Sequence, residues 1–428
     1  MTKPLAGRAW PALDLVVFAV TLPLYAAAVP LGLGRVEAAA SVAAGITVDP
    51  DPQGAPLALL AMRLIQYLPV GDVGFRANLT SAIFGALAMA LLARLAVELV
   101  TPLRPPPSAR QDARAFLAEP IAAGGAALAA ALSLGTFAAA TSAGFCTPTL
   151  VVLLAGLLAE LVLLRDIGNK AAGLALSCLA GVAEGVEPTV ALVLWPVLLA
   201  LAIWALRKGA RWPLWAPLGL LAALGGFALA RAAASSVPPS ARDLFVTPFT
   251  LIPRGRAALW STATEIADQA GVVGVLLAAV GLFALAVRTP VVAAWLALNL
   301  VTCTLFASFA VVAEPEIASF LPALPMAIAV VFALACVGVW HVSSRLGRAR
   351  VAAALTLTVI LAFPSAMDGG RTRWLGRPLP MRLLDRALER AEVRGVVDPG
   401  TAEMAGVFRL ARAIGLRPDL DIKAKSDR

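Results

Sequence analysis

Long apolar stretches, separated by short polar or charged segments, recur along almost the whole chain. Eleven of them are roughly 17 to 25 residues long, which is the length an α-helix needs to cross a bilayer. Ala and Leu dominate these stretches, and the alternating segments typical of membrane β-barrels are absent from the sequence. The pattern predicts an all-α integral membrane protein with transmembrane helices near residues 13–33, 77–101, 119–141, 148–164, 171–187, 189–206, 213–235, 270–287, 290–312, 318–340 and 350–366.

Composition supports a membrane protein. Of the 428 residues, 60% are hydrophobic and only 14% are charged, whereas soluble domains are roughly 45 to 50% apolar. The net charge of +9 suits orientation in the membrane, so no nucleic-acid partner is expected. The four cysteines fall in or beside apolar stretches without CxxC spacing, and we expect small buried side chains there, not a disulfide framework or zinc site. The single histidine, His341, excludes a histidine cluster.

Lys and Arg alternate from one connection to the next. They gather in the segments that follow every second predicted helix, and the tight turns between carry none. Because positive residues collect on the cytoplasmic side, this pattern predicts a cytoplasmic N-terminus and an outward C-terminal tail. The first apolar stretch could instead be a cleaved signal peptide, although its length of about twenty residues favours a retained helix.

Three outward segments are longer than turns. Residues 34–76 contain a turn-rich stretch and then an apolar segment, 57–68, which is too short to span and is expected to lie along the membrane interface. Residues 234–270 carry several prolines and arginines. The tail is expected to form two or three short helices. The predicted organisation is a membrane domain at 1–366 and a small external domain at 367–428.

Charged residues provide the candidate chemistry. An outward carboxylate could act as a general base, and an arginine could bind a lipid phosphate, but both kinds of residue could also be ordinary solvated loop charges. Glu160 falls inside a predicted helix, where a carboxylate is a candidate functional group; it could equally reach the interface or pair with Arg165. The Gly124-Gly125 and Gly225-Gly226 pairs predict close helix packing.

The segment from Gly34 to Leu95 resembles the protein O-mannosyltransferase-like group of GT-C membrane glycosyltransferases. In that family, an Asp-x-Gly-Glu motif follows the first helix and a His-Pro-Pro-Gly-x-Pro-Leu motif comes next. The corresponding stretches here are GRVE at 34–37 and DPQGAPL at 51–57. The stretches LPVGD at 68–72 and FRANLTSA at 75–82 continue the family pattern, and RPDL at 417–420 resembles a motif of its external tail.

The chain also departs from the family pattern. The acidic residue expected as the catalytic base is replaced by Gly34, and the family's histidine is replaced by Asp51. The family's Glu-Val-Tyr stretch is replaced by Gly144-Phe145-Cys146, and the position of the family's His-His pair falls around Val186 and Glu187. Either the chain is a non-catalytic relative, or a neighbouring carboxylate has taken over the role of the base.

The resemblance implies a GT-C-like bundle that transfers a sugar from a polyprenyl-phosphate donor to an external acceptor, a protein or a glycan. The candidate catalytic residues are Glu37, Asp49 and Asp51. The candidate ligands of the lipid phosphate are Arg76, Arg242, Arg254 and Arg256. A divalent metal is possible but not indicated. The alternatives are an inactive relative that binds lipid-linked sugar or serves as a scaffold and, less favoured, a transporter. The Ala, Arg and Leu bias suits a bacterial inner membrane.

Overall fold

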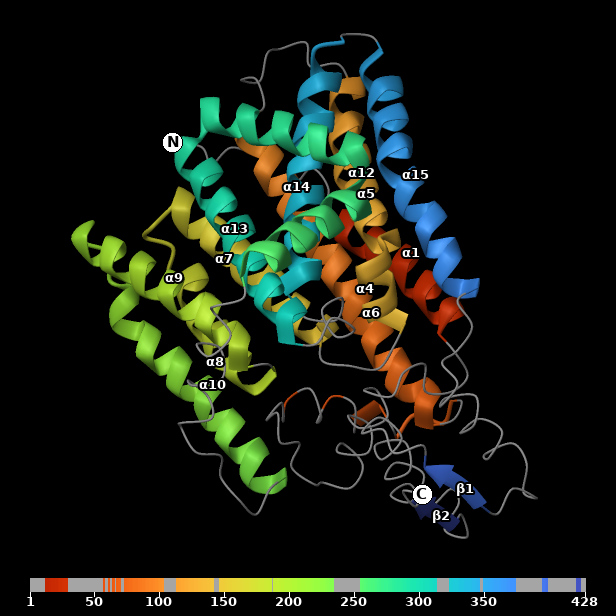
Figure 1. The fold of residues 1–428 in the computed structure, drawn as a ribbon. Coiled ribbons are helices and arrows are strands. Elements are labelled where there is room, and N and C mark those ends of the chain that lie inside the picture. Colours follow the sequence, from red (N-terminus) through yellow and green to blue (C-terminus); the bar gives the residue numbers. More distant parts are fainter. Residues whose placement is uncertain are drawn as a thin grey trace.

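The computed structural model is a bundle of packed helices with a small strand pair at one end (Figure 1). It describes residues 12–29, isolated positions between 57 and 70, 73–103, 113–141, 146–186, 188–234, 255–313, 323–346, 349–374, 395–398 and 421–424. The helices of the first half are α1 (Leu13–Ala28), α4 (Val73–Val100), α5 (Ala113–Leu132), α6 (Leu134–Thr141), α7 (Cys146–Arg165), α8 (Lys170–Val186), α9 (Pro188–Arg207) and α10 (Trp212–Ala234). Those of the second half are α12 (Gly255–Arg288), α13 (Pro290–Ala313), α14 (Ala323–Ser344) and α15 (Arg350–Trp374).

A helix occupies each of the eleven predicted positions, which confirms an all-α, multi-pass membrane fold. Among the described residues, four helices are both long and apolar enough to span a bilayer, and the bent pair of α5 and α6 gives a fifth if it is one broken span. The remaining helices of the bundle have shorter apolar lengths in their described parts. The number of crossings therefore stays a prediction.

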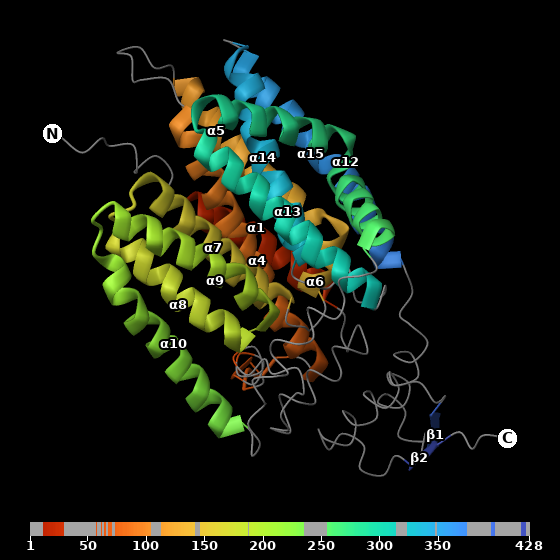
Figure 2. The ribbon, with the colours of Figure 1, turned by 60° about the vertical axis from the view of Figure 1, so that its left-hand side comes forward.

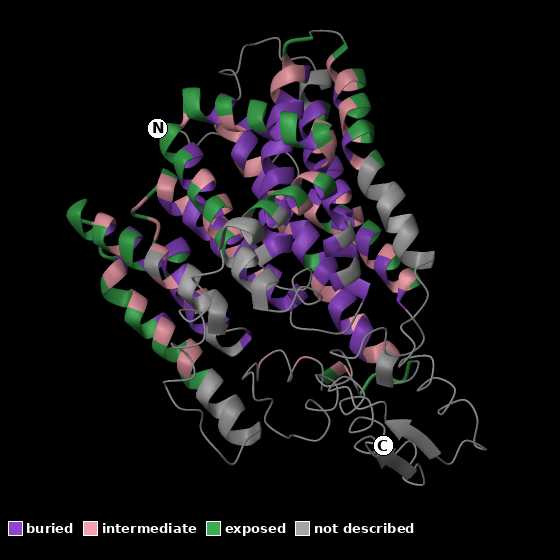
Figure 3. Ribbon diagram, in the orientation of Figure 1, coloured by how far each residue is buried: buried purple, intermediate pink, exposed green. Residues whose placement is uncertain are grey.

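Helices α4, α5 and α14 form the centre of the bundle, and α14 is its most buried helix (Figure 3). Their facing sides consist largely of alanine, which lets the backbones approach closely. Helices α8, α9 and α10 form a separate group at one side of the bundle, joined to the centre mainly through α7 (Figures 1 and 2). The outer sides of α10, α12, α13 and α15 expose large apolar side chains, as expected for lipid-facing surfaces.

Small residues set the closest helix crossings. A Cβ atom added at Gly281 of α12 would overlap the backbone carbonyl oxygen of Leu334 in α14, and one at Gly338 of α14 would overlap that of Leu277 in α12. Gly125 of α5 similarly lies against Thr358 of α15, which confirms the close packing predicted for the Gly124-Gly125 pair.

The Gly225-Gly226 pair does not behave as predicted. Both residues are exposed on α10, and a Cβ atom at either position would meet no described atom within 4 Å. A glycine pair is therefore not sufficient evidence of a helix crossing, because a crossing also requires a partner helix on that face.

The first apolar stretch is an integral part of the bundle. Helix α1 packs against α4 and α5, and its Tyr25 is completely buried. All four cysteines are free: three are buried, and Cys178 is partly buried. The burial of the cysteines agrees with the prediction that they pack as small side chains. Retention of the first helix stays a prediction.

The tail differs from the predicted set of helices. Strands β1 (Gly395–Asp398) and β2 (Asp421–Ala424) form a parallel pair, in which Gly395 lies opposite Asp421. They lie at the end of the bundle where α4 begins and α10 ends (Figures 1 and 2). Parallel strands require a long crossover connection, usually a helix. The helices predicted for the tail lie outside the described residues.

Candidate functional site

A broken helix lies at the predicted outer end of the bundle. The sequence predicts one helix over 119–141, but α5 and α6 meet at Ser133 with a bend of 71°. The Ser133 hydroxyl donates to the carbonyl oxygen of Ala130 at 2.7 Å and is 3.1 Å from the Thr136 hydroxyl. A serine that bonds to its own backbone competes with the helical hydrogen-bond ladder, which favours a break at this point.

Side chains from two other helices satisfy backbone groups at the break. The Tyr25 hydroxyl of α1 donates to the carbonyl oxygen of Ala131 at 3.1 Å. The amide of Gly135 donates to Gln269 Oε1 of α12 at 2.9 Å, and Gln269 Nε2 donates to Glu265 Oε1 at 2.6 Å. Because lipid offers no hydrogen bonds, non-helical backbone inside a membrane must be satisfied by protein or line a polar cavity. Tyr25 and Gln269 therefore stabilise the break.

Substituting Tyr25→Phe is expected to lower the unfolding free energy by about 1 kcal/mol, because it removes one hydrogen bond and leaves the Ala131 carbonyl unpaired. The ring would keep its edge-on contact with Phe137, whose centroid lies 5.9 Å away. Thermal unfolding in detergent would measure the change. The matched control is Tyr67→Phe, at the only other tyrosine, which is 75% exposed. Equal effects of the two substitutions would contradict the assigned role of Tyr25.

Buried polar side chains gather in the outer turns of α4 and α7. Asn78, Thr80 and Ser81 of α4, and Thr147 and Thr149 of α7, are each at most 1% exposed. The hydroxyls of Ser81 and Thr147 have no hydrogen-bond partner in the described structure. Buried polar groups are nearly always paired, so these two hydroxyls indicate a place for water or a polar ligand group. Hydroxyl and amide groups of this kind suit the oxygens of a sugar or phosphate.

Arg76, one of the predicted phosphate ligands, lies in the first turns of α4. Its Nη1 donates to the carbonyl oxygen of Leu68 at 2.9 Å. This bond joins the start of α4 to the end of the predicted interface segment, in which the described residues Leu57, Ala61, Leu64 and Ile65 are helical. Leu64 and Tyr67 are exposed, as expected for a segment that lies on a membrane surface. The structure therefore gives Arg76 a role in positioning this segment.

The other predicted site residues lie mostly outside the described part of the chain. This holds for Glu37, Asp49, Asp51, Arg242 and Arg254. Arg256 belongs to the first turn of α12, but its side chain is outside the described structure. No group of three or more potential metal ligands occurs among the described residues. The catalytic carboxylates, the arginines and a possible metal therefore stay predictions.

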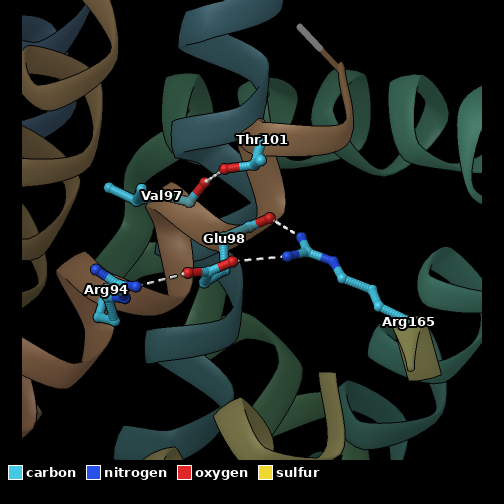
Figure 4. Close-up of polar contacts among 5 residues, drawn as sticks. All are labelled: Arg94, Val97, Glu98, Thr101 and Arg165. Atoms are coloured by element: carbon cyan, nitrogen blue, oxygen red, sulfur yellow. Dashed lines mark hydrogen bonds and ion pairs between the residues drawn. The ribbon is translucent and has the colours of Figure 1, made fainter. Parts of the chain in front are cut away.

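The suggested pairing of Glu160 with Arg165 is wrong. Arg165 Nη1 instead lies 2.6 Å from Glu98 Oε2 of α4, and its Nη2 donates to the backbone carbonyl of Glu98 (Figure 4). Arg94 Nη2 approaches the other carboxylate oxygen at 2.9 Å. Glu160 is 1% exposed, and its Oε2 has no hydrogen-bond partner. Helical spacing explains the difference, because residues five apart on a helix do not share a face.

Substituting Arg165→Gln is expected to lower the unfolding free energy by roughly 1–2 kcal/mol, because the ends of α4 and α7 would lose a two-point contact. The loss would leave the Glu98 carbonyl, one of the last in α4, without its side-chain donor. Arg211→Gln is the control, since Arg211 is exposed and has no ion pair within the described structure. Chemical or thermal unfolding in detergent would compare the two. A change no larger than that of the control would show that the contact is dispensable.

Sequence reasoning missed Tyr25, Gln269 and the break at Ser133. The Ser-Leu-Gly stretch at 133–135 is a weak break signal inside an otherwise apolar stretch. Nothing in the local sequence indicates that Gln269, 134 residues further along the chain, meets Gly135.

Two comparisons with known proteins identify the architecture. Residues 40–210 match the family model described as the protein O-mannosyl-transferase TMEM260 N-terminal domain. The crystal structure of ArnT from Cupriavidus metallidurans bound to undecaprenyl phosphate is similar, with a TM-score of 0.60 and 14% sequence identity over 97% of this chain and 90% of that one. No curated protein matches the sequence. The chain thus has the GT-C membrane fold of that structure, and its residues 40–210 resemble the N-terminal domain of a protein O-mannosyl-transferase.

Proposed function

We propose that the protein is a membrane glycosyltransferase that transfers a sugar from a polyprenyl-phosphate donor to an acceptor outside the cytoplasm. The observation that carries this proposal is the likeness of nearly the whole chain to a protein that was crystallised with undecaprenyl phosphate. The family match over residues 40–210 supports transfer to a protein hydroxyl group. The unpaired hydroxyls of Ser81 and Thr147 lie at the end of the bundle where such a site is expected.

The proposed reaction is a displacement at the anomeric carbon of the donor sugar. A carboxylate of the 34–76 segment, Glu37, Asp49 or Asp51, accepts the proton of the acceptor hydroxyl. The acceptor oxygen then bonds to the anomeric carbon, and the bond from that carbon to the phosphate oxygen breaks. The electron pair leaves on the polyprenyl phosphate, whose charge Arg242, Arg254 or Arg256 neutralises.

The proposed location is a bacterial inner membrane, with the N-terminus in the cytoplasm and the C-terminal tail outside it. Support comes from the alternating loop charges and from the position of β1 and β2 at the end of the bundle where α4 begins. Cysteine-accessibility labelling of intact cells would test this, with single cysteines at Thr2 and at Ser426 as probes. Labelling at Ser426 but not at Thr2 by an impermeant maleimide is expected.

The test of function is transfer by the purified full-length protein in liposomes. Undecaprenyl phosphate carrying radiolabelled mannose, and in parallel glucose, would be supplied with membrane extract from a strain that lacks the gene. The expected result is label in an acceptor that appears only with the protein. Donor binding without any transfer would favour the inactive relative instead. Absence of both binding and transfer, with the protein folded, would overturn the proposal.

A further inference from the structure

Helix α12 is divided by a backbone break at Gly271. This residue has φ 69° and ψ 162°, in a region that is almost exclusive to glycine. The break separates an outer half, residues 255–270, from an inner half, residues 272–288, that packs on α14. The direction of the outer half is therefore not fixed by continuation of the inner helix, and other contacts must set it.

The outer half contacts the bundle along one side. Thr262, Ile266, Gln269 and Ala270 are buried, at positions that helical spacing places near one another, whereas Trp260 is 74% exposed. Gln269 lies at the inner end of this side, two residues before Gly271. Its side-chain oxygen accepts a hydrogen bond from the Gly135 amide, and its side-chain nitrogen donates one to Glu265, one turn earlier on the same helix. A single side chain therefore links the break in α12 to the break between α5 and α6.

The fit between Gln269 and Gly135 is close. A Cβ atom at position 135 would lie 3.0 Å from Gln269 Oε1 and 3.3 Å from its Nε2. A side chain at position 135 would thus displace the amide group from its hydrogen bond. Gly135 therefore supplies the amide donor and, because it lacks a side chain, the space for the Gln269 amide group. Gln269 supplies the acceptor oxygen.

We infer that Gln269 is a positioning residue that fastens the outer half of α12 to the broken helix. This inference rests on the proposed function, because the chain that leads into α12 carries Arg254 and the first turn of α12 carries Arg256. Holding the outer half against α6 positions the backbone at the start of α12, where the proposed function places its phosphate-binding arginines. Gln269 acts through α12 and does not itself contact the donor.

The kinetic test compares Gln269→Met with the wild type. Met keeps the length of the side chain but removes the hydrogen bonds, so we expect the KM for the polyprenyl-phosphate donor to rise about tenfold, the size expected for one lost bond that leaves a buried amide unpaired. The kcat should change by less than about twofold, as expected when binding of the donor is affected more than the chemical step. Asp268→Asn, on the exposed side of the same turn, is the control and should leave both constants unchanged.

A second variant distinguishes positioning from general destabilisation. Gly135→Ala should raise the KM in the same way, and the double variant Gly135→Ala with Gln269→Met should be little worse than either single variant, because both remove the same contact. Additive effects would overturn the inference, as would an unchanged KM in Gln269→Met.

A distance measurement tests the inference without enzymatic activity. Nitroxide labels would be placed at Trp260→Cys on the outer half of α12 and at Leu87→Cys on α4, both exposed positions, in a variant that lacks the four native cysteines. Pulsed electron resonance should give a narrow distance distribution that broadens with Gln269→Met. An unchanged distribution would overturn the positioning role. A broadened distribution in a protein that neither binds nor transfers the donor would support that role while rejecting the proposed function.

Discussion

Gly338→Ala is expected to prevent the native packing of α12 against α14 and to lower the unfolding free energy by about 3 kcal/mol or more. The new methyl group would overlap the backbone carbonyl of Leu277, and backbone atoms of two packed helices cannot rotate away as the end of a long side chain can. Gly281→Ala, whose methyl group would meet the carbonyl of Leu334, should have a similar effect. Because α14 lies at the centre of the bundle, the yield of folded protein in detergent should also fall.

A glycine-to-alanine substitution on α10 should instead raise the unfolding free energy. Gly225→Ala and Gly226→Ala introduce the same methyl group at exposed helical positions that have no described atom within 4 Å. The higher helix propensity of Ala should stabilise the protein by roughly 0.5–1 kcal/mol at each position. Thermal unfolding of the four variants in one detergent makes the comparison. If Gly338→Ala were as stable as Gly225→Ala, the close crossing of α12 and α14 would be wrong.

The largest expected effect on activity comes from the carboxylates of the 34–76 segment. Loss of a general base typically lowers kcat by about 10² to 10⁴-fold. We therefore expect either Glu37→Gln or Asp51→Asn to reduce transfer by this amount, since Glu37 is the retained acid of the first motif and Asp51 occupies the histidine position of the second. Radiolabel transfer in liposomes at saturating donor measures kcat, and donor binding should persist in both variants.

Asp166→Asn is the matched control, because Asp166 is exposed at the opposite, predicted cytoplasmic end of the bundle. Full activity in both Glu37→Gln and Asp51→Asn would remove these two residues from the site and direct the search to Asp49. If Asp49→Asn were fully active as well, the first outward segment would not supply the base at all.

The positions of the helices could be read from the sequence because hydrophobic length is a local property. Every predicted stretch, from 13–33 to 350–366, contains a helix. The breaks could not be read with the same success. The stretch 119–141 contains two helices. Ser133 and Gly135 only permit the break between them locally, and the backbone groups at the break are satisfied by Tyr25 and Gln269 from distant helices.

The candidate site shows the same division. Local motifs point to Glu37, Asp49, Asp51 and the arginines as the chemistry-bearing residues, and these stay predictions. The structure instead draws attention to Ser81, Thr147 and Gln269, whose significance depends on burial and on partners far away in the chain. Ser and Thr are common in membrane helices, so their identity alone does not distinguish a site from ordinary packing.

The sequence by itself determined the class of the protein, the places of its helices and the family it resembles, because apolar length and short motifs are encoded over a few neighbouring residues. Only the tertiary structure decided which glycines lie at crossings, which carboxylate pairs with Arg165, and how the two helix breaks are joined. Each of these depends on what another helix presents to the same face. Gly338 and Gly225 are the same residue in similar apolar helices, yet one meets the backbone of α12 and the other meets no described neighbour.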